Sequence, residues 1–224
     1  RERKIDRRPA QEHPRIKELG RMKGEWRESL YSQKSMDKIP IQRIRLLHDL
    51  RKALPRDAIV AGASGGTNGW YEYAFEALAH NQGVGGWHPL GAEYPEALGV
   101  KVALPDRIVI CLTGDGSLMM TLQEIATAAS NNIAVLCVVC RNGAFGNMRH
   151  TQLTKYGGRF IGTDLPACNL ADVARDLGAY GERVETPFEI IPAIGRALAS
   201  GKASLLEVMI DDSPENLVPP SGGD

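Results

Sequence analysis

The sequence predicts an α/β protein built on a mostly parallel, doubly wound sheet with helices on both faces. Short apolar runs of strand length alternate with longer stretches in which apolar residues recur at helical spacing. The clearest runs, 107–113 and 133–140, are apolar at nearly every position, which is typical of strands covered on both faces. The alternation shows no internal repeat, which favours a sheet covered on both faces, and 224 residues fit one large domain or one domain plus a tail.

The N-terminal segment differs in composition from the rest of the chain. Residues 1–52 hold 16 Lys/Arg and 8 Asp/Glu, although the whole chain has 27 of each. Residues 1–14 are charged and contain two prolines, which predicts an irregular linker. Residues 15–30 carry one apolar stripe at helical spacing, and 31–38 are polar. We therefore expect residues 1–38 to be a linker and helical N-terminal extension.

The main domain is expected over residues 39–212. Pro40 begins a helix that Pro55 ends, because proline suits the first turn of a helix and does not continue one. A short strand at 57–61 leads into a glycine-rich loop at 62–69. Glycines let backbone N–H groups approach a ligand closely, so this loop is a candidate binding element, with a plain surface loop as the alternative.

The remaining elements continue the alternation of helices and strands. The Thr186–Glu189 pattern is a capping box with Pro187 at the first helical position, and residues 213–224, rich in Pro, Gly and Ser, read as a C-terminal tail. The expected elements are helices at 70–79, 92–104, 118–132, 169–177 and 186–200, strands at 107–113, 133–140, 179–184 and 204–210, and a long polar loop at 147–162.

An acidic turn lies between the strand at 107–113 and the helix that follows it. Gly114-Asp115-Gly116-Ser117 occupies the carboxyl end of a strand and the amino end of a helix, where phosphate binding is favoured. An aspartate there repels phosphate unless a divalent cation lies between them. Asp115, together with Asn142 after the next strand, offers two hard oxygen ligands of the kind that Mg²⁺ prefers. An ordinary Rossmann-like turn with a capping aspartate is the alternative.

This arrangement resembles the diphosphate-binding motif of thiamine diphosphate (TPP) enzymes, in which Gly-Asp-Gly is followed after a fixed interval by Asn. The run 114–127, with Gln123-Glu124 and Ala126-Thr127, is similar to the acetolactate synthase and benzoylformate decarboxylase branch. The resemblance covers about residues 40–210. It implies the TPP-binding fold, TPP and Mg²⁺ as cofactors, and a chain that corresponds to the C-terminal diphosphate-binding domain of a larger enzyme.

The resemblance also implies which residues form the cofactor site. Asp115, Asn142 and the backbone carbonyl of Ala144 would bind the metal. Thr67 and Asn68 stand where the family has His and Gln, and Leu90 stands where a bulky apolar residue bends TPP into its V shape. The expected cofactor-binding residues are Gly65, Thr67, Asn68, Leu90, Gly91, Gly114, Asp115, Gly116, Ser117, Asn142, Ala144, Phe145 and Gly146.

No residue of this chain is assigned a catalytic role with certainty. The candidates for the substrate pocket are His88, Phe145, Met148, Arg149 and His150. Thr151 falls where acetolactate synthases carry a Trp, which argues against a strict acetolactate synthase assignment. Glu93 and Glu96 stand where the family prefers small residues, and we expect both to be solvated helix residues.

In the family, a glutamate that activates the TPP pyrimidine lies on a separate pyrimidine-binding domain, and nothing here matches that domain. The resemblance therefore implies that such a domain, in the same full-length chain or in a partner subunit, is needed for decarboxylation or carboligation of a small 2-keto acid, in a homodimer or homotetramer. Residues 1–38 would be the end of a preceding domain. Two alternatives remain: a non-catalytic binding or assembly module, and a Mg²⁺-dependent enzyme using another diphosphate.

Composition and motifs argue against several other classes. The basic N-terminal segment mixes charges and has few aromatic residues, so we expect no nucleic-acid partner. No 18-residue apolar run and no signal peptide are seen, which predicts no membrane association. No Walker motif or G-x-G-x-x-G is present. The four cysteines form no metal-binding pattern, and free buried thiols predict a cytoplasmic protein.

Overall fold

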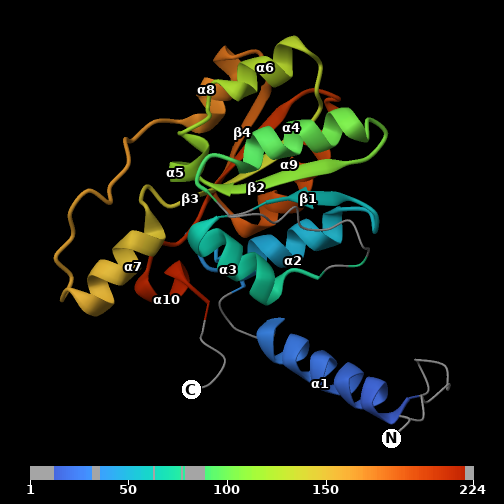
Figure 1. The fold of residues 1–224 in the computed structure, drawn as a ribbon, viewed down its shortest axis with the longest axis vertical. Coiled ribbons are helices and arrows are strands. Elements are labelled where there is room, and N and C mark those ends of the chain that lie inside the picture. Colours follow the sequence, from blue (N-terminus) through green and yellow to red (C-terminus); the bar gives the residue numbers. More distant parts are fainter. Residues whose placement is uncertain (1–12, 32–35, 63, 77, 79–88, 220–224) are drawn as a thin grey trace, which may run out of the picture. The chain divides into compact units, whose positions relative to one another are not determined.

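The computed structural model describes residues 13–31, 36–62, 64–76, 78 and 89–219, and the chain divides into a unit before residue 36 and a main unit after it. The first unit contains α1 (Pro14–Tyr31) (Figure 1). The apolar stripe expected on this helix is present, with Ile16, Leu19, Met22 and Trp26 all exposed. Within the described residues, no helix combines the length and apolar character needed to cross a bilayer.

The main unit is built on a five-stranded sheet in which every pairing is parallel. This confirms the predicted fold class. Because all strands run the same way, their carboxyl ends meet at one edge, where α/β sheets bind ligands. In spatial order the strands are β1 (Ile59–Ala61), β2 (Val109–Gly114), β3 (Leu136–Arg141), β5 (Ser204–Met209) and β4 (Tyr180–Val184).

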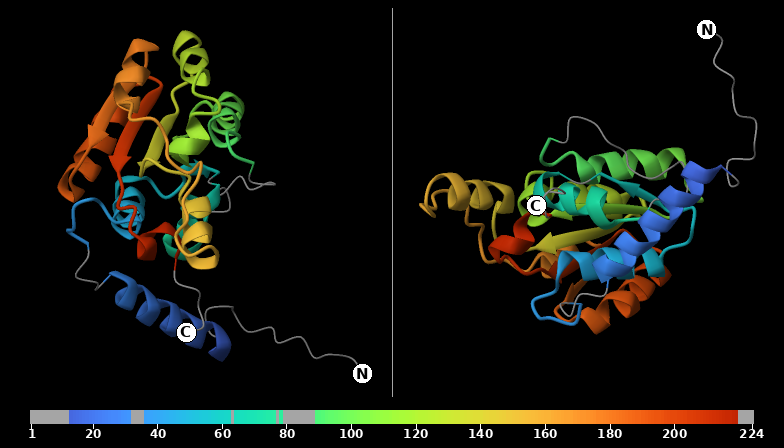
Figure 2. Two further views of the ribbon diagram at one scale, coloured as in Figure 1. Left: turned by 90° about the vertical axis from the view of Figure 1, so that its left-hand side faces the viewer. Right: turned by 90° about the horizontal axis from the view of Figure 1, so that it is seen from below.

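Helices cover both faces of the sheet. Cys111, Cys137 and Val139 pack into a core beneath one helical layer, and the view from below shows α4 and α9 on opposite sides of the strands (Figure 2). The three described cysteines in the strands are buried free thiols, as expected. One layer contains α4 (Glu93–Ala103), α6 (Glu124–Ser130) and α8 (Leu170–Asp176), and the other contains α2 (Arg43–Ala53), α3 (Gly65–Ala74) and α9 (Ile190–Ala199).

Two expected helices have different boundaries. The helix expected from Pro40 begins at Arg43, because Ile41 pairs with Ile210 beyond the end of β5 and holds the preceding residues extended. The helix expected over 118–132 is divided into α5 (Asp115–Leu118) and α6. Between them, hydrogen bonds of the i to i+3 type at Met120 and Thr121 tighten the chain into turns.

Three segments expected to be irregular contain helices. The glycine-rich loop at 62–69 becomes helical at Gly65, whose φ of +58° is one that glycine adopts readily. The polar loop at 147–162 is helical up to Lys155 as α7 (Gly146–Lys155). The described part of the expected tail forms α10 (Pro214–Leu217). Polarity and glycine content suggested loops, whereas tertiary contacts at the sheet edge favour helices.

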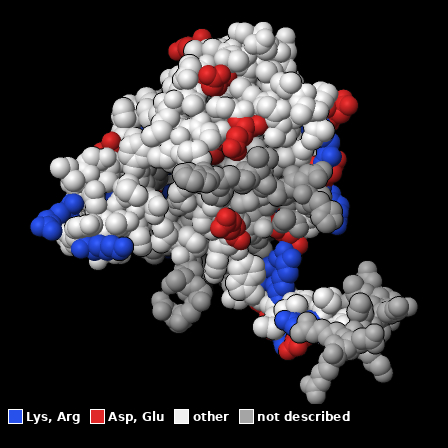
Figure 3. Space-filling view, viewed as in Figure 1, with Lys and Arg blue, Asp and Glu red and all other residues white. Residues whose placement is uncertain are grey.

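The helix start predicted at Thr186, near the end of the domain, is present. The capping box at Thr186 is present and starts a 3₁₀ turn, η2 (Pro187–Glu189), that continues into α9. On the face shown in Figure 3, basic side chains of the main unit lie over α7 and along the right-hand edge, and acidic side chains are scattered.

Candidate cofactor site

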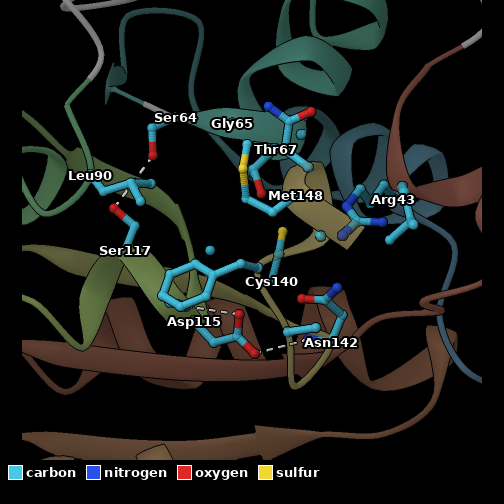
Figure 4. Close-up of a pocket in the computed structure, with 18 residues that line it drawn as sticks. Arg43, Ser64, Gly65, Thr67, Leu90, Asp115, Ser117, Cys140, Asn142 and Met148 are labelled. Atoms are coloured by element: carbon cyan, nitrogen blue, oxygen red, sulfur yellow. Dashed lines mark hydrogen bonds between the residues drawn. The ribbon is translucent and has the colours of Figure 1, made fainter. Parts of the chain in front are cut away.

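A cavity of about 260 Å³ lies at the carboxyl edge of β2 and β3. Segments far apart in the sequence build its wall: the start of α3, the turn from β2 into α5, the loop from β3 into α7, and α10 (Figure 4). The expected residues that line it are Gly65, Thr67, Leu90, Gly114, Asp115, Gly116, Ser117, Asn142, Ala144, Phe145, Gly146 and Met148.

The Asp115 carboxylate is buried and held by four donors. Its Oδ2 accepts hydrogen bonds from the backbone N–H groups of Asn142 (3.2 Å) and Gly143 (2.7 Å) and from Nη1 of Arg141 (2.9 Å). Its Oδ1 accepts one, from the N–H of Gly116 (2.9 Å). Burial raises the pKa of Asp115 above its usual value, and these donors oppose that shift. The orientation of the carboxylate is therefore fixed, and Oδ1 accepts fewer hydrogen bonds than Oδ2.

Arg141 links Asp115 to a second buried carboxylate, Glu207 of β5. The Arg141 Nη1 pairs with Asp115, its Nε lies 3.5 Å from Oε1 of Glu207, and its Nη2 donates to the carbonyl of Pro166 (2.7 Å). All three charged side chains are buried. A buried charge is tolerated when it is paired and hydrogen-bonded, so this chain of contacts stabilises the carboxylate at the site. The sequence analysis did not single out Arg141 or Glu207.

Asn142 and Ala144 each have an oxygen atom that could bind a metal ion: the side-chain amide oxygen of Asn142 and the backbone carbonyl of Ala144. Nδ2 of Asn142 is buried without a hydrogen-bond partner among the described residues. Ala144 and Asp164 form an isolated antiparallel β-bridge. The two hydrogen bonds of this bridge are made by the flanking residues: the N–H of Phe145 donates to the carbonyl of Thr163, and the N–H of Leu165 donates to the carbonyl of Gly143. In such a pair the residue's own carbonyl points away from the partner segment. With Asp115, these groups fit a hard cation that keeps several ligands from elsewhere.

Within the described part of the chain, no three His, Cys, Asp or Glu side chains form a group that could hold a metal ion. The expected ligand set contains one carboxylate, one amide and one carbonyl. It suits Mg²⁺, which binds through few protein ligands when phosphate oxygens complete the octahedron.

Two backbone features shape the wall of the cavity. The first turn of α3, Gly65 to Thr67, lines the cavity, and Ser64 at its N-cap makes no capping hydrogen bond. The free N–H groups at a helix start attract anions. On the opposite turn, a Cβ on Gly116 would lie 2.6 Å from the Phe145 ring. Glycine is required there because Phe145 occupies the space.

Ser117 and Glu93 correct one expectation. Glu93 is 3% exposed rather than solvated, and its Oε2 accepts a 2.6 Å hydrogen bond from the Ser117 hydroxyl. The Ser117 oxygen in turn accepts from the N–H of Gly91 (2.7 Å). Gly91 therefore supports the cavity wall through Ser117 without lining it. Glu96, on the same helix, is half-buried.

Several expected residues lie outside the cavity lining. The Asn68 side chain donates to Glu72 (3.1 Å). Arg149 forms ion pairs with Asp164 and Asp212 and lies over the Phe160 ring, and His150 is half-buried on α7. His88 falls outside the described residues. Conversely, the cavity is also lined by residues that the sequence analysis had not selected: Arg43, Ser64, Gly66, Cys140, Asn147 and Leu217.

Comparison with known families identifies the family to which this fold belongs. The model described as "Thiamine pyrophosphate enzyme, C-terminal TPP binding domain" matches residues 63–208. The chain belongs to this family. The match spans the cavity-lining segments from α3 to the loop after β3, which confirms the family that the Gly-Asp-Gly and Asn pattern indicates.

Relatives of this TPP-binding domain are considerably longer proteins. A probable acetolactate synthase of Mycobacterium bovis is 32% identical over 179 residues, 79% of this chain and 33% of that protein. A sulfoacetaldehyde acetyltransferase of Castellaniella defragrans is 30% identical over 171 residues, 74% of this chain and 29% of that protein. The chain thus spans about a third of the length of the curated relatives it matches.

A solved structure shows the same fold. The Rhodococcus jostii RHA1 thiamine diphosphate-dependent 4-hydroxybenzoylformate decarboxylase superposes with a TM-score of 0.70 at 28% identity. The superposition covers 77% of this chain and 33% of that protein. The relatives are thus acetolactate synthases and other TPP-dependent enzymes.

Proposed function

We propose that this TPP-binding domain holds TPP through a Mg²⁺ ion at the cavity beside Asp115. Asp115 Oδ1, the Asn142 amide oxygen and the Ala144 carbonyl would bind the ion, and the first turn of α3 would bind diphosphate oxygens. The observation that carries the proposal is the convergence of these groups on one cavity at the carboxyl edge of the sheet.

We propose further that the whole protein decarboxylates or carboligates a small 2-keto acid. When bound, TPP supplies the nucleophilic carbon and the electron sink for loss of carbon dioxide. Leu90 would support the bent cofactor, and Phe145 and Met148, which line the cavity, would exclude water beside it. Arg149 and His150 remain candidates for the outer part of the substrate pocket, as does His88.

The proposed activity requires a second domain. Of the described residues that line the cavity, Asp115 is the one carboxylate, and its oxygens are turned to backbone donors and Arg141. No described lining residue is thus placed to activate the pyrimidine ring. A pyrimidine-binding domain in the same full-length chain or in a partner subunit would supply that group, within a cytoplasmic homodimer or homotetramer.

Calorimetry tests the cofactor proposal directly. TPP is titrated into the intact protein with Mg²⁺ and again after removal of divalent cations with EDTA. We expect saturable binding with Mg²⁺ and at least a tenfold loss of affinity without it, because a cation must separate Asp115 from the diphosphate. Equal affinity in both conditions would contradict the proposed metal role.

A non-catalytic binding module is the second candidate. The side chain of Asn68, in the position where the family has Gln, is turned to Glu72 and does not line the cavity. An assay for release of carbon dioxide from pyruvate by the intact protein, at saturating TPP and Mg²⁺, distinguishes the enzyme from the non-catalytic module. Turnover supports the enzyme, and tight binding without turnover of pyruvate or other 2-keto acids supports the module.

A further inference from the structure

Arg43 is a buried guanidinium in the cavity wall. It lies at the start of α2, is 4% exposed, and lines the cavity. In Figure 4 it lies on the opposite side of the cavity from Leu90. Its Nη1 donates to the backbone carbonyls of Asp211 (3.3 Å) and Asn216, while its Nε is buried without a partner. Burial lowers the pKa of Arg43.

The carboxylates around Arg43 are already engaged by other donors. Asp115 is paired with Arg141, and Asp212 is paired with Arg149. The carboxylate of Asp211 accepts from Gln42 Nε2 (2.7 Å) and the Ser213 hydroxyl (2.8 Å). Among the described residues, Arg43 makes no ion pair of its own. A buried charge without an ion pair is costly unless an anion arrives to compensate it.

We propose that Arg43 is a further binding residue for the anionic end of the cofactor. The proposal rests on the proposed function, since the anion is the diphosphate of TPP. Leu90 is expected beneath the bend of the cofactor, so the opposite side, where Arg43 lies, is suited to the phosphates. The guanidinium would share them with the first turn of α3 and with the cation at Asp115. A planar guanidinium is well matched to phosphate oxygens.

Phosphate binding by Arg43 can be distinguished from a purely structural role by its effect on ligand affinity. A purely structural Arg43 would hold α10 through the carbonyl of Asn216, and ligand affinity would then not depend on the charge of the side chain. A phosphate-binding Arg43 acts on any ligand that carries the diphosphate. Inorganic pyrophosphate with Mg²⁺ is therefore the sharpest probe, because it presents that group without thiazole or pyrimidine contacts.

Two substitutions separate charge from hydrogen bonding. R43Q keeps amide donors for the carbonyls of Asp211 and Asn216 but removes the charge, whereas R43K keeps the charge. R51Q is the matched control. Arg51 is also on α2, donates to the backbone carbonyls of Leu54 and Pro55, and has its pKa lowered by burial, but it does not line the cavity.

Dissociation constants for pyrophosphate and TPP are measured by calorimetry on the intact protein at saturating Mg²⁺. We expect R43Q to weaken both ligands by about tenfold or more, as for the loss of a charged hydrogen bond, with R43K tighter than R43Q and R51Q within twofold of the unchanged protein. R43Q binding both ligands within twofold, or R43K no tighter than R43Q, would overturn the proposal. Failure of the unchanged protein to bind TPP would instead overturn the proposed function, and this inference with it.

Discussion

The Ser117 hydroxyl donates a 2.6 Å hydrogen bond to Oε2 of Glu93, and both side chains are buried at the edge of the cavity. Ser117 also accepts from the N–H of Gly91, so the bond connects the start of α4, the turn before it and α5. The other Glu93 oxygen, Oε1, is buried without a partner among the described residues. A helix residue expected in solvent is therefore part of the framework that supports the site.

Replacing Glu93 tests this framework. We expect Glu93→Ala to lower the free energy of unfolding by about 1–3 kcal/mol, because Ser117 loses its acceptor in a buried position. Glu93→Gln keeps an acceptor oxygen and has a smaller effect. Urea unfolding measures both. Glu96→Ala on the same helix is the control, with a change below about 1 kcal/mol, and equal losses for Glu93→Ala and Glu96→Ala would contradict the role.

Asp115→Asn tests the metal ligand with little change in shape. We expect Mg²⁺-dependent TPP affinity to fall by about 100-fold or more, because even supporting residues of metal sites contribute about 10- to 100-fold. Calorimetry at fixed TPP with increasing Mg²⁺ measures the loss. Asp172→Asn, an exposed carboxylate paired with Arg175 on α8, serves as the control. Unchanged Mg²⁺ dependence in Asp115→Asn would show that the ion binds elsewhere.

Arg141→Met tests the buried charge chain behind Asp115. The substitution leaves Asp115 and Glu207 without their shared cation, and removing one partner of a buried pair costs about 3–5 kcal/mol. The expected result is a large fall in the urea midpoint. Arg175→Met breaks an exposed pair instead and is expected to cost less than about 1 kcal/mol. Similar midpoints for the two variants would refute the importance of this chain.

Gly116→Ala tests the close approach of the acidic turn to Phe145. The added Cβ would lie 2.6 Å from the ring and force Phe145 to move within the cavity wall. We expect weaker TPP binding and a loss of about 1–3 kcal/mol of stability from overpacking. Gly99→Ala in α4 meets nothing within 4 Å and is expected to stabilise the protein by about 0.5–1 kcal/mol. Thermal unfolding and TPP titration of both variants make the comparison.

Glu189 provides a pH-dependent contribution to stability. The N–H groups of Thr186 and then Glu185 lower the pKa of Glu189 below its usual value. Its stabilising effect is therefore complete above the unfolded pKa and is lost as pH falls through the lower, folded pKa. We expect Glu189→Ala to cost about 0.5–2 kcal/mol at pH 7. Unfolding curves should show that this difference shrinks in acid.

The control for this effect is Glu185→Ala, which removes an exposed carboxylate while keeping the backbone N–H that Glu189 accepts from. We expect a change below about 0.5 kcal/mol, the usual range for an exposed position. A Glu189→Ala difference that stays constant down to the acid transition would contradict the assignment to an ionised carboxylate.

Local patterns predicted the strands, most helices and the binding turn. Apolar runs specify buried strands because every position of such a strand is covered, and the capping box specifies its own helix start through hydrogen bonds between near neighbours. The Gly114–Ser117 turn and Asn142 were recognisable because a ligand set needs particular atoms at a particular spacing. Their meeting at one cavity follows from β2 and β3 lying side by side in parallel.

Other features depend on contacts between distant segments, which no local pattern contains. Arg43 reaches the cavity because Ile41 pairs with Ile210 and brings the start of α2 to the sheet edge. Leu217 lines the cavity from a segment that composition alone describes as a tail. Arg141 and Glu207 meet because β3 and β5 are neighbours. Periodicity and spacing thus specified the secondary-structure elements and the Gly114–Ser117 turn. Which charged side chains are buried, and how they pair, was decided only by the tertiary structure, because desolvation of a side chain depends on every segment that packs around it.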